Sequence, residues 1–131
     1  MPRHVINVGN PEGLPLSEAV RFGDLVFVSG MVGSDAAGAI VEGGIAAETR
    51  QVFRNIEAVL AQAGCSLGEV IKVNVVLTNA NDFDAFNAAY RTIFPSDPPA
   101  RVSMVAGLTI EACIEVDVIA GCGNKPGEVK S

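Results

Sequence analysis

The chain has 131 residues, of which 49% are hydrophobic and 18% are charged, and its formal net charge is −6. This length predicts one domain over residues 1–131 with a sizeable hydrophobic core. The acidic balance, without any cluster of basic residues, argues against a nucleic-acid partner, because such binding depends on cationic side chains. The apolar composition favours association with further copies of the chain.

Compartment and metal chemistry are constrained by what the sequence lacks. No run is long and apolar enough to span a membrane and no signal peptide is recognisable, so we expect a cytoplasmic location. Cys65, Cys113 and Cys122 are odd in number and widely spaced, which predicts three reduced thiols rather than a disulfide framework or a zinc site. His4 is the single histidine, and we expect a surface residue rather than a metal ligand.

The first half of the chain predicts a hairpin followed by a helix. Residues 17–22 and 25–29 predict two short strands joined by a tight turn at Gly23-Asp24, and residues 30–44 predict a loop. Apolar side chains then recur at helical spacing over residues 45–63, and Gly64 supplies a natural end. We expect the apolar stripe of this helix to lie on a sheet.

The second half begins with a strand and a second helix. Residues 70–77 alternate in period two, with Val73, Val75 and Leu77 on the more buried face. Aromatic and apolar residues at positions 83, 86, 90 and 93 then recur at three and four residues, which predicts a helix. Asn81 is the candidate cap at its start, and Pro95 lies just beyond its end.

Two more strands complete the pattern. Residues 101–106 and 113–120 predict strands linked by residues 107–112, and residues 121–131 form a polar tail. The order of elements predicts an α+β fold in which two helices cover one face of a mixed sheet.

Arg101 and Glu115 are the charges most relevant to function, because each lies inside an apolar, β-branched strand where an unpaired ion is costly. A hairpin register that opposes Arg101 to Asp117 and Ser103 to Glu115 would bring all four residues together. Two interpretations stay open. Arg101 forms a structural ion pair with a neighbouring carboxylate, or its fork of donors binds the carboxylate of a small acid while Glu115 handles a water and a proton.

Other candidate residues carry weaker signals. Ser29-Gly30 ends a strand, where a backbone N–H can receive an oxyanion, although turn chemistry is the favoured explanation of the pair. Ser103 lacks a histidine partner for nucleophilic catalysis. The aromatic residues of the second helix are interpreted as core packing. No glycine-rich nucleotide loop follows a strand, so any catalysis is expected to be free of cofactors and metals.

Residues 25–33, 49–95, 98–108 and 114–120 resemble the RidA family, also called YjgF/YER057c/UK114 or, by an older label, endoribonuclease L-PSP. The likeness runs from about Leu16 to Ala120. It implies a chorismate-mutase-like (ferredoxin-like) α+β fold that forms a homotrimer, with a central β-barrel and ligand clefts between subunits. The activity that it implies is hydrolysis of enamine or imine acids to 2-oxo acids and ammonia without a cofactor.

By position, the resemblance implies that Arg101 binds the substrate carboxylate and that Glu115 holds the water. It also assigns Ser29, Gly30 and Asn87 to the cleft. The family's deaminase branch has a tyrosine where this chain has Leu16 and a cysteine where it has Ser103, and its loop between the arginine and the glutamate is one residue longer. These differences indicate a sibling subgroup with a different or broader imine preference. A carboxylate-binding regulatory module without turnover is the alternative function, and RNA cleavage is a third that the acidic charge disfavours.

Overall fold

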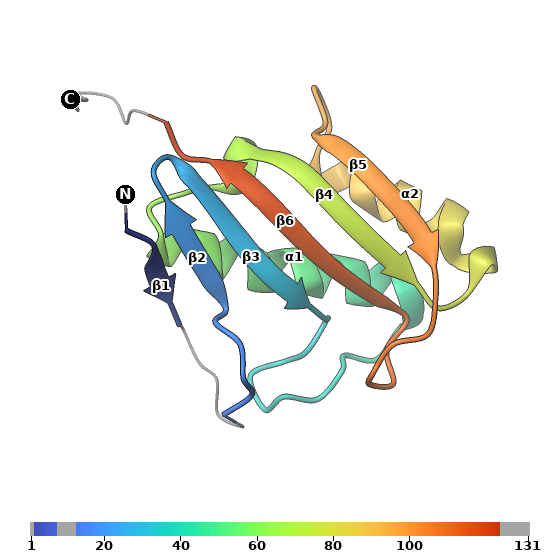
Figure 1. Ribbon diagram of the computed structural model, residues 1–131. Helices are drawn as coiled ribbons and strands as arrows, with labels where there is room; N and C mark the ends of the chain where they lie inside the picture. The colour runs from blue at the N-terminus through green and yellow to red at the C-terminus, as the bar shows by residue number, and fades with distance from the viewer. Residues whose placement is uncertain (1, 8–12, 124–131) are drawn as a thin grey trace.

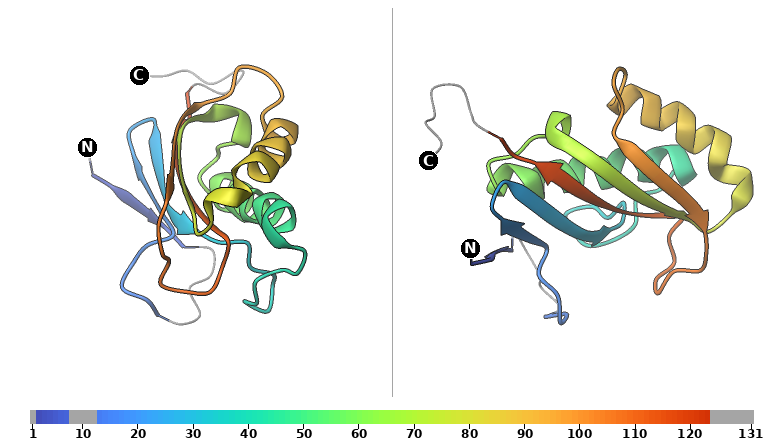
Figure 2. Two further views of the ribbon diagram at one scale, coloured as in Figure 1. Left: turned by 90° about the vertical axis from the view of Figure 1, so that its right-hand side faces the viewer. Right: turned by 45° about the horizontal axis from the view of Figure 1, so that its top comes forward.

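A mixed sheet and two helices form the two layers of the molecule (Figure 1). The computed structural model describes residues 2–7 and 13–123, and within these ranges the helices α1 and α2 lie on the same face of the sheet (Figure 2). The α+β class with both helices on one face is therefore confirmed. The strands and helices are β1 (His4–Ile6), β2 (Ala19–Phe22), β3 (Leu25–Met31), α1 (Gly44–Gln62), β4 (Val70–Leu77), α2 (Phe83–Ile93), β5 (Ala100–Val105) and β6 (Ile114–Gly121).

Most of the predicted elements occur close to their predicted bounds. The predicted polar tail lies outside the described residues from position 124 onward. The strand β1 was not predicted, because three residues in a polar segment carry too little pattern to recognise; it pairs with β2 at the edge of the sheet, with His4 opposite Arg21. His4 is exposed, as expected.

The strand order is β1-β2-β3-β6-β4-β5, with β4 and β5 parallel and every other neighbouring pair antiparallel. The strands β5 and β6 follow one another in the chain, but β4 lies between them. The predicted hairpin that opposes Arg101 to Asp117 and Ser103 to Glu115 is therefore wrong. Residues 106–113 are long enough to pass over one strand, since neighbouring strands lie only about 5 Å apart.

The core lies between the sheet and the helices. The helix α1 buries its predicted stripe, including Val52, Ile56 and Leu60, and it ends before Gly64, whose φ is 75°. Glycine adopts this left-handed conformation without a steric penalty, which explains the stop. Alternate residues of β4 and β6 are buried against the helices, as their period of two predicts.

The start of α2 differs from the prediction in its cap. The side chain of Asn79, not of Asn81, accepts a hydrogen bond, and it does so from the backbone N–H of Asn81 in the 3-10 turn η2 (Ala80–Asp82). The turn η2 leads directly into α2, so Asn81 lies inside η2 and is not the residue that caps its start. Within α2, Phe86 and Tyr90 are core residues, whereas Phe83 is 42% exposed and is not core packing.

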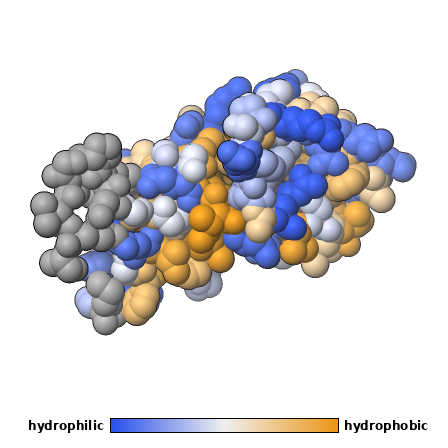
Figure 3. All heavy atoms as spheres, turned by 90° about the horizontal axis from the view of Figure 1, so that it is seen from above, coloured by the Kyte–Doolittle hydropathy of each residue, from blue (hydrophilic) through white to orange (hydrophobic). Residues whose placement is uncertain are grey.

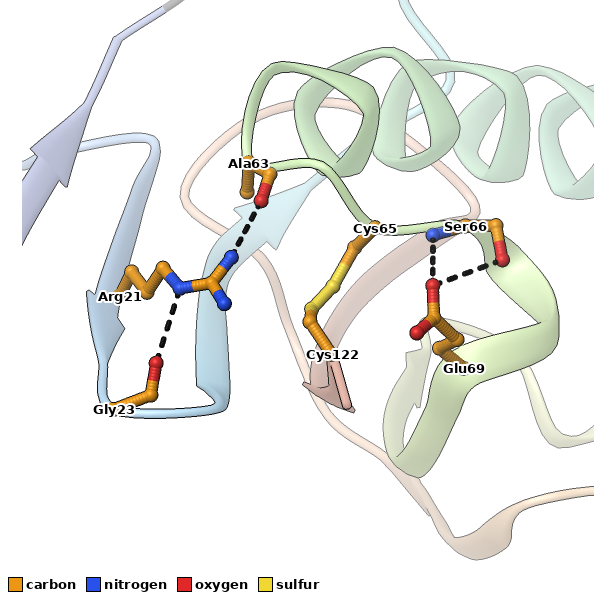
Figure 4. The surroundings of a disulfide bond; sticks show 7 residues. All are labelled: Arg21, Gly23, Ala63, Cys65, Ser66, Glu69 and Cys122. Carbon is orange, nitrogen blue, oxygen red and sulfur yellow. Dashed lines mark hydrogen bonds between the residues drawn. A yellow bond between two sulfur atoms is a disulfide. The ribbon is translucent and has the colours of Figure 1, made fainter. Parts of the chain in front are cut away.

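The prediction of three reduced thiols is wrong for two of the three. Cys65 follows α1 and Cys122 follows β6, and the two form a disulfide with their Cα atoms 5.5 Å apart (Figure 4). Both side chains are buried, and Cys113 is free. The packing of the end of α1 against the end of β6 brings together cysteines that are 57 positions apart, so their spacing in the sequence contained no signal.

Hydrogen bonds tie further segments together at this end of the molecule (Figure 4). The guanidinium of Arg21 in β2 donates to the carbonyl oxygens of Ala63, at 2.7 Å, and Gly23, at 3.0 Å. The 3-10 turn η1 (Leu67–Glu69) begins with a capping box, in which Ser66 and the carboxylate of Glu69 contact each other. The hairpin β2–β3, the end of α1 and the end of β6 are thus joined.

The face of the sheet opposite the helices, which we call the open face, carries many apolar side chains. Figure 3 views the molecule from above, so that the open face points downward, and the orange atoms of hydrophobic residues gather along the lower side of the molecule. About two fifths to one half of the surface of each large apolar residue on the open face is exposed, for example 43% for Phe27. This bare surface agrees with the expected self-association, which stays a prediction. The exposed apolar side chains of these strands include Val5, Phe22, Leu25, Phe27, Ile71, Val102 and Met104.

Candidate functional site

Arg101 lies on the edge strand β5 and turns its side chain toward α2. Its guanidinium carbon is 4.8 Å from the ring centre of Tyr90, 5.1 Å from that of Phe86 and 5.8 Å from that of Phe83. A guanidinium over aromatic faces is held by cation–π attraction, which leaves its N–H edges for other partners. Within the described ranges, no carboxylate pairs with Arg101.

Asn87 reaches the same place from α2. A hollow of about 290 Å³ is bounded by α2, by the segment that leads into β5 and by Arg101 itself. The structure therefore brings together two of the residues that the sequence singled out, Arg101 and Asn87. The complete lining is Asn87, Tyr90, Arg91, Phe94, Pro98, Pro99 and Arg101.

Tyr90 is a residue of this region that sequence reasoning assigned only to the core. Its hydroxyl is buried and has no hydrogen-bond partner among the described residues. Burial raises the pKa of the Tyr90 hydroxyl above its ordinary value, and the positive charge of Arg101 opposes this rise. Tyr90 therefore stays neutral and presents its ring to the arginine.

Glu115 lies on the other face of the sheet. In the register of β6 it is opposite Val76 of β4, and it points away from the helices onto the open face. Gly30 of β3 lies against it, because a Cβ atom at that glycine would be 2.7 Å from Oε2 of Glu115. The register of β3 with β6 shifts between Val28 and Met31, and this irregularity places Gly30 beside the carboxylate. The predicted site residues Gly30 and Glu115 are thus in contact.

The donors of Ser29 are used inside the chain. Its hydroxyl donates to the carbonyl oxygen of Ser17 at 2.5 Å, and its backbone N–H donates to that of Glu18 at 2.9 Å. An oxyanion at the N–H of Ser29, which the sequence left open, is therefore not supported. Leu16 lies just before β2 and is 47% exposed.

The structural ion pair that the sequence left open is absent from the described part of the chain. Asp117 accepts a hydrogen bond of 2.8 Å from the side chain of Asn74, not from Arg101. Arg101 is opposite Val73, which faces the helices, whereas Glu115 is opposite Val76, which faces the open side. The two charges therefore point to opposite faces of one sheet and cannot pair within one chain.

Ser103 shares the helix-facing side of β5 with Arg101. Its hydroxyl is buried and finds no hydrogen-bond partner among the residues that the structure describes. It lines a second hollow, of about 280 Å³, at the end of β5. We call the candidate residues Arg101, Ser103 and Asn87 the arginine half-site, and the candidate residues Glu115 and Gly30 the glutamate half-site.

Glu48 is a buried carboxylate of α1 that lies outside the apolar stripe of the helix. It is only 4% exposed, and its Oε1 accepts a hydrogen bond of 2.8 Å from the backbone N–H of Cys113. A hydrogen bond to Glu48, together with burial and the charges of Glu48 and Asp82, raises the pKa of the Cys113 thiol from 9.0 to about 11. The thiol of Cys113 is therefore protonated at neutral pH, and the backbone N–H of Cys113 attaches the loop before β6 to Glu48.

Two further observations concern the geometry of possible metal ligands and the length of the helices. Residues 2–7 and 13–123 contain no group of three or more His, Cys, Asp or Glu side chains arranged to hold a metal ion. Neither helix in these ranges is long and apolar enough to cross a bilayer.

Together, the mixed sheet, the two helices on one of its faces and the bare opposite face define a class of small α+β proteins. Known proteins of this class make the assignment specific. The sequence profile described as endoribonuclease L-PSP matches residues 11–122, and the chain belongs to this family, which is also called the RidA or YjgF/YER057c/UK114 family.

The relatives include proteins with assigned activities. A RutC family protein of Pyrococcus horikoshii is 42% identical over 116 residues, which cover 87% of this chain and 91% of that protein. The human 2-iminobutanoate/2-iminopropanoate deaminase is 36% identical over 122 residues, or 90% of this chain and 89% of that enzyme. Relatives named as imine deaminases support such a role for the family.

Solved structures agree with the fold. The crystal structure of yeast Mmf1 matches with a TM-score of 0.85 at 31% identity and covers 92% of this chain and 98% of that one. The crystal structure of RidA from the Antarctic bacterium Psychrobacter matches with a TM-score of 0.78 at 34% identity, with coverage of 89% and 92%.

Proposed function

We propose that this protein is a cofactor-free deaminase that hydrolyses 2-imino acids, and the enamines that tautomerise to them, to 2-oxo acids and ammonia. The observation that supports it best is the guanidinium of Arg101, which lies over aromatic rings and has no anionic partner in the described part of the chain. A cation held in this way is suited to a small carboxylate, which its planar fork binds at two points. The deaminase names of the relatives point to the same substrate class.

The proposed chemistry needs only positioning and proton transfer. Arg101 binds the carboxylate, and Glu115 holds a water molecule against the carbon of the C=N bond and accepts one of its protons. The water oxygen adds to that carbon, a proton moves to the nitrogen, and the C–N bond breaks with release of ammonia. An enamine first takes a proton on its β-carbon. One water is consumed, and no oxidant or reductant is required.

The site is proposed to be shared between subunits. Arg101 and Glu115 point to opposite faces of their own sheet, so a cleft that contains both needs the arginine half-site of one copy and the glutamate half-site of another. The apolar open face supplies the surface for such an assembly. We expect the homotrimer that the family resemblance implies, located in the cytoplasm.

The experiment has an activity part and a complementation part. Amino-acid oxidases generate imines, semicarbazide traps them, and the protein should lower semicarbazone formation while it speeds the release of ammonia. Arg101→Ala and Glu115→Ala should each abolish this effect. Unfolded and reassembled together in equal amounts, the two variants should recover about a quarter of the wild-type rate, since one interface in four combines an intact arginine with an intact glutamate.

The outcomes separate the functions under consideration. Complete inactivity of wild-type protein toward several imines would contradict the deaminase. If calorimetry then showed that 2-oxo acids bind and that Arg101→Ala does not bind them, the regulatory-module function would take its place. Activity of the deaminase without recovery in the mixed assembly would contradict the shared site alone.

A further inference from the structure

Glu48 is a buried charged group that the chemistry proposed above does not use. A carboxylate removed from water is costly unless hydrogen bonds replace its hydration. The backbone N–H of Cys113 donates one such bond, and the thiol of the same residue is hydrogen-bonded to the carboxylate as well. Cys113 immediately precedes β6. The carboxylate of Glu48 therefore joins the start of α1 to the start of β6, which meet at one end of the molecule (Figure 1).

The start of β6 carries Glu115 and has few other supports. The strand β3 pairs with β6 only as far as Val116, so at Ile114 and Glu115 the strand β4 is the single neighbour of β6 among the described strands. Most of the preceding loop, residues 106–113, is exposed to solvent, so apolar packing does little to fix it. The position of Glu115 therefore depends on how the loop is attached where it enters the strand.

Cys113 is held from two sides at this entry point. Its carbonyl oxygen accepts a hydrogen bond of 3.1 Å from the backbone N–H of Thr78, which follows β4, and its own N–H donates to Glu48. The backbone of Glu48 is in turn packed against Gly33, where a Cβ atom would be 2.7 Å from the carbonyl oxygen of Glu48. Gly33 follows β3, so Glu48 contacts the segments next to both strands of the glutamate half-site.

We propose that Glu48 is a positioning residue for Glu115. By accepting the N–H of Cys113 it fixes the first residues of β6, and with them the direction in which the carboxylate of Glu115 points beside Gly30. This inference rests on the proposed function, in which that carboxylate holds the water. Glu48 belongs to the helical layer whereas Glu115 points onto the open face, so Glu48 acts through the backbone and touches neither substrate nor water. What the site requires from Glu48 is an acceptor at this place, not a charge.

Three substitutions separate the acceptor from the charge. Glu48→Gln removes the charge but keeps a side-chain oxygen at the same distance from the backbone, so kcat for imine hydrolysis should stay close to the wild-type value. Glu48→Asp keeps the charge on a shorter side chain, and Glu48→Ala removes the acceptor. Both should lower kcat about tenfold or more, because a small misplacement of a group that acts on the substrate commonly costs one to two orders of magnitude. KM should change little, because Arg101 still binds the substrate carboxylate.

The control variant lowers stability at the other ends of the same two elements. Cys65→Ala with Cys122→Ala removes the disulfide that joins the segments after α1 and after β6. It should unfold more readily and still keep the wild-type kcat at temperatures where it is folded. An equal loss of kcat in this control, an equal loss in Glu48→Gln and Glu48→Asp, or a wild-type kcat in Glu48→Asp would overturn the proposal. These outcomes hold even if Glu48→Ala does not fold.

NMR measurements make the inference testable without turnover. The backbone amide of Cys113 should exchange with solvent about tenfold or more faster in Glu48→Asp than in the wild type and Glu48→Gln, because its hydrogen bond is lost. The carboxyl carbon signal of Glu115, identified by its loss in Glu115→Ala, should shift in Glu48→Asp. The amide of Cys122, which donates to Asp24 at 2.7 Å beyond the other end of β6, should exchange at the wild-type rate.

The two sets of measurements separate this inference from the proposed function. A protein that hydrolyses none of the imines, but in which Glu48→Asp produces both NMR changes, would contradict the deaminase and support the positioning of Glu115 by Glu48. An active deaminase in which Glu48→Asp leaves kcat, the amide exchange and the Glu115 signal unchanged would do the reverse.

Discussion

Replacement of Gly30 by alanine tests whether the position of Glu115 controls turnover. The new Cβ atom would be 2.7 Å from Oε2, whereas ordinary contacts begin near 3.4 Å, so the carboxylate must retreat by about 0.7 Å, and a misplacement of this size commonly costs one to two orders of magnitude in rate. The φ angle of Gly30 is one that alanine also adopts. The folded state is therefore retained, and we expect kcat to fall about 10- to 100-fold while the free energy of unfolding changes by less than about 1 kcal/mol.

The assay follows imine hydrolysis, with urea unfolding measured on the same samples. Gly107→Ala is the matched control, because a Cβ atom at Gly107 meets nothing within 4 Å and its φ is also not positive; this variant should keep full activity. In a Glu115→Ala background, Gly30→Ala should cause no further loss, because the two changes act through one carboxylate. Full activity of Gly30→Ala, or an equal loss in both backgrounds, would refute the reasoning.

Two further predictions concern the cysteines. Cys65→Ala with Cys122→Ala should lower the free energy of unfolding of the oxidised protein by about 4 kcal/mol, the loop-closure value for a loop that spans 57 positions. Thermal unfolding with and without dithiothreitol measures this difference, and an unchanged midpoint would contradict it. With a pKa near 11 instead of 9.0, Cys113 should react with iodoacetamide at pH 8 about 100-fold more slowly than an ordinary thiol, since the thiolate is the nucleophile. Glu48→Gln should speed the reaction, and the opposite result would exclude Glu48 as the cause. In the unfolded chain the thiol of Cys113 loses its proton at a lower pH than in the folded chain. This thiol should therefore lower the free energy of unfolding as the pH rises from about 9 to about 11.

Local patterns were sufficient to predict most individual elements. The period of two in β4 gave its bounds, Val70 to Leu77, and the helical spacing located α1 to within one residue at each end. These patterns follow from burial of one side of an element, which depends on neighbours in the sequence. The cap of α2 was misassigned to Asn81 because Asn79, Asn81 and Asp82 are all capping residues in one short segment.

Contacts between distant segments were beyond the reach of these patterns. The alternation of β5 and β6 is compatible with direct pairing and equally with insertion of β4 between them, and the structure shows insertion. The disulfide depends on the same long-range packing. The charge of Glu48 gave no sign that this side chain is buried, but the loop before β6 supplies the N–H of Cys113 to its carboxylate. The resemblance to the family named the candidate site residues, whereas only the structure shows that Arg101 and Glu115 lie on opposite faces of the sheet.

This division follows from the parity of the strand registers. Arg101 is opposite Val73 and Glu115 is opposite Val76, an odd separation along β4, so the two side chains point to opposite faces. A shift of one residue in either register would place both charges on one face, where they could neutralise each other, and the arginine would then be unavailable to a ligand. The observed register keeps Arg101 and Glu115 apart within a chain. If the cleft forms between copies, as proposed, the same register also makes turnover depend on assembly. A dissociated chain carries both Arg101 and Glu115, but on opposite faces of its sheet, so the two side chains cannot contact one substrate.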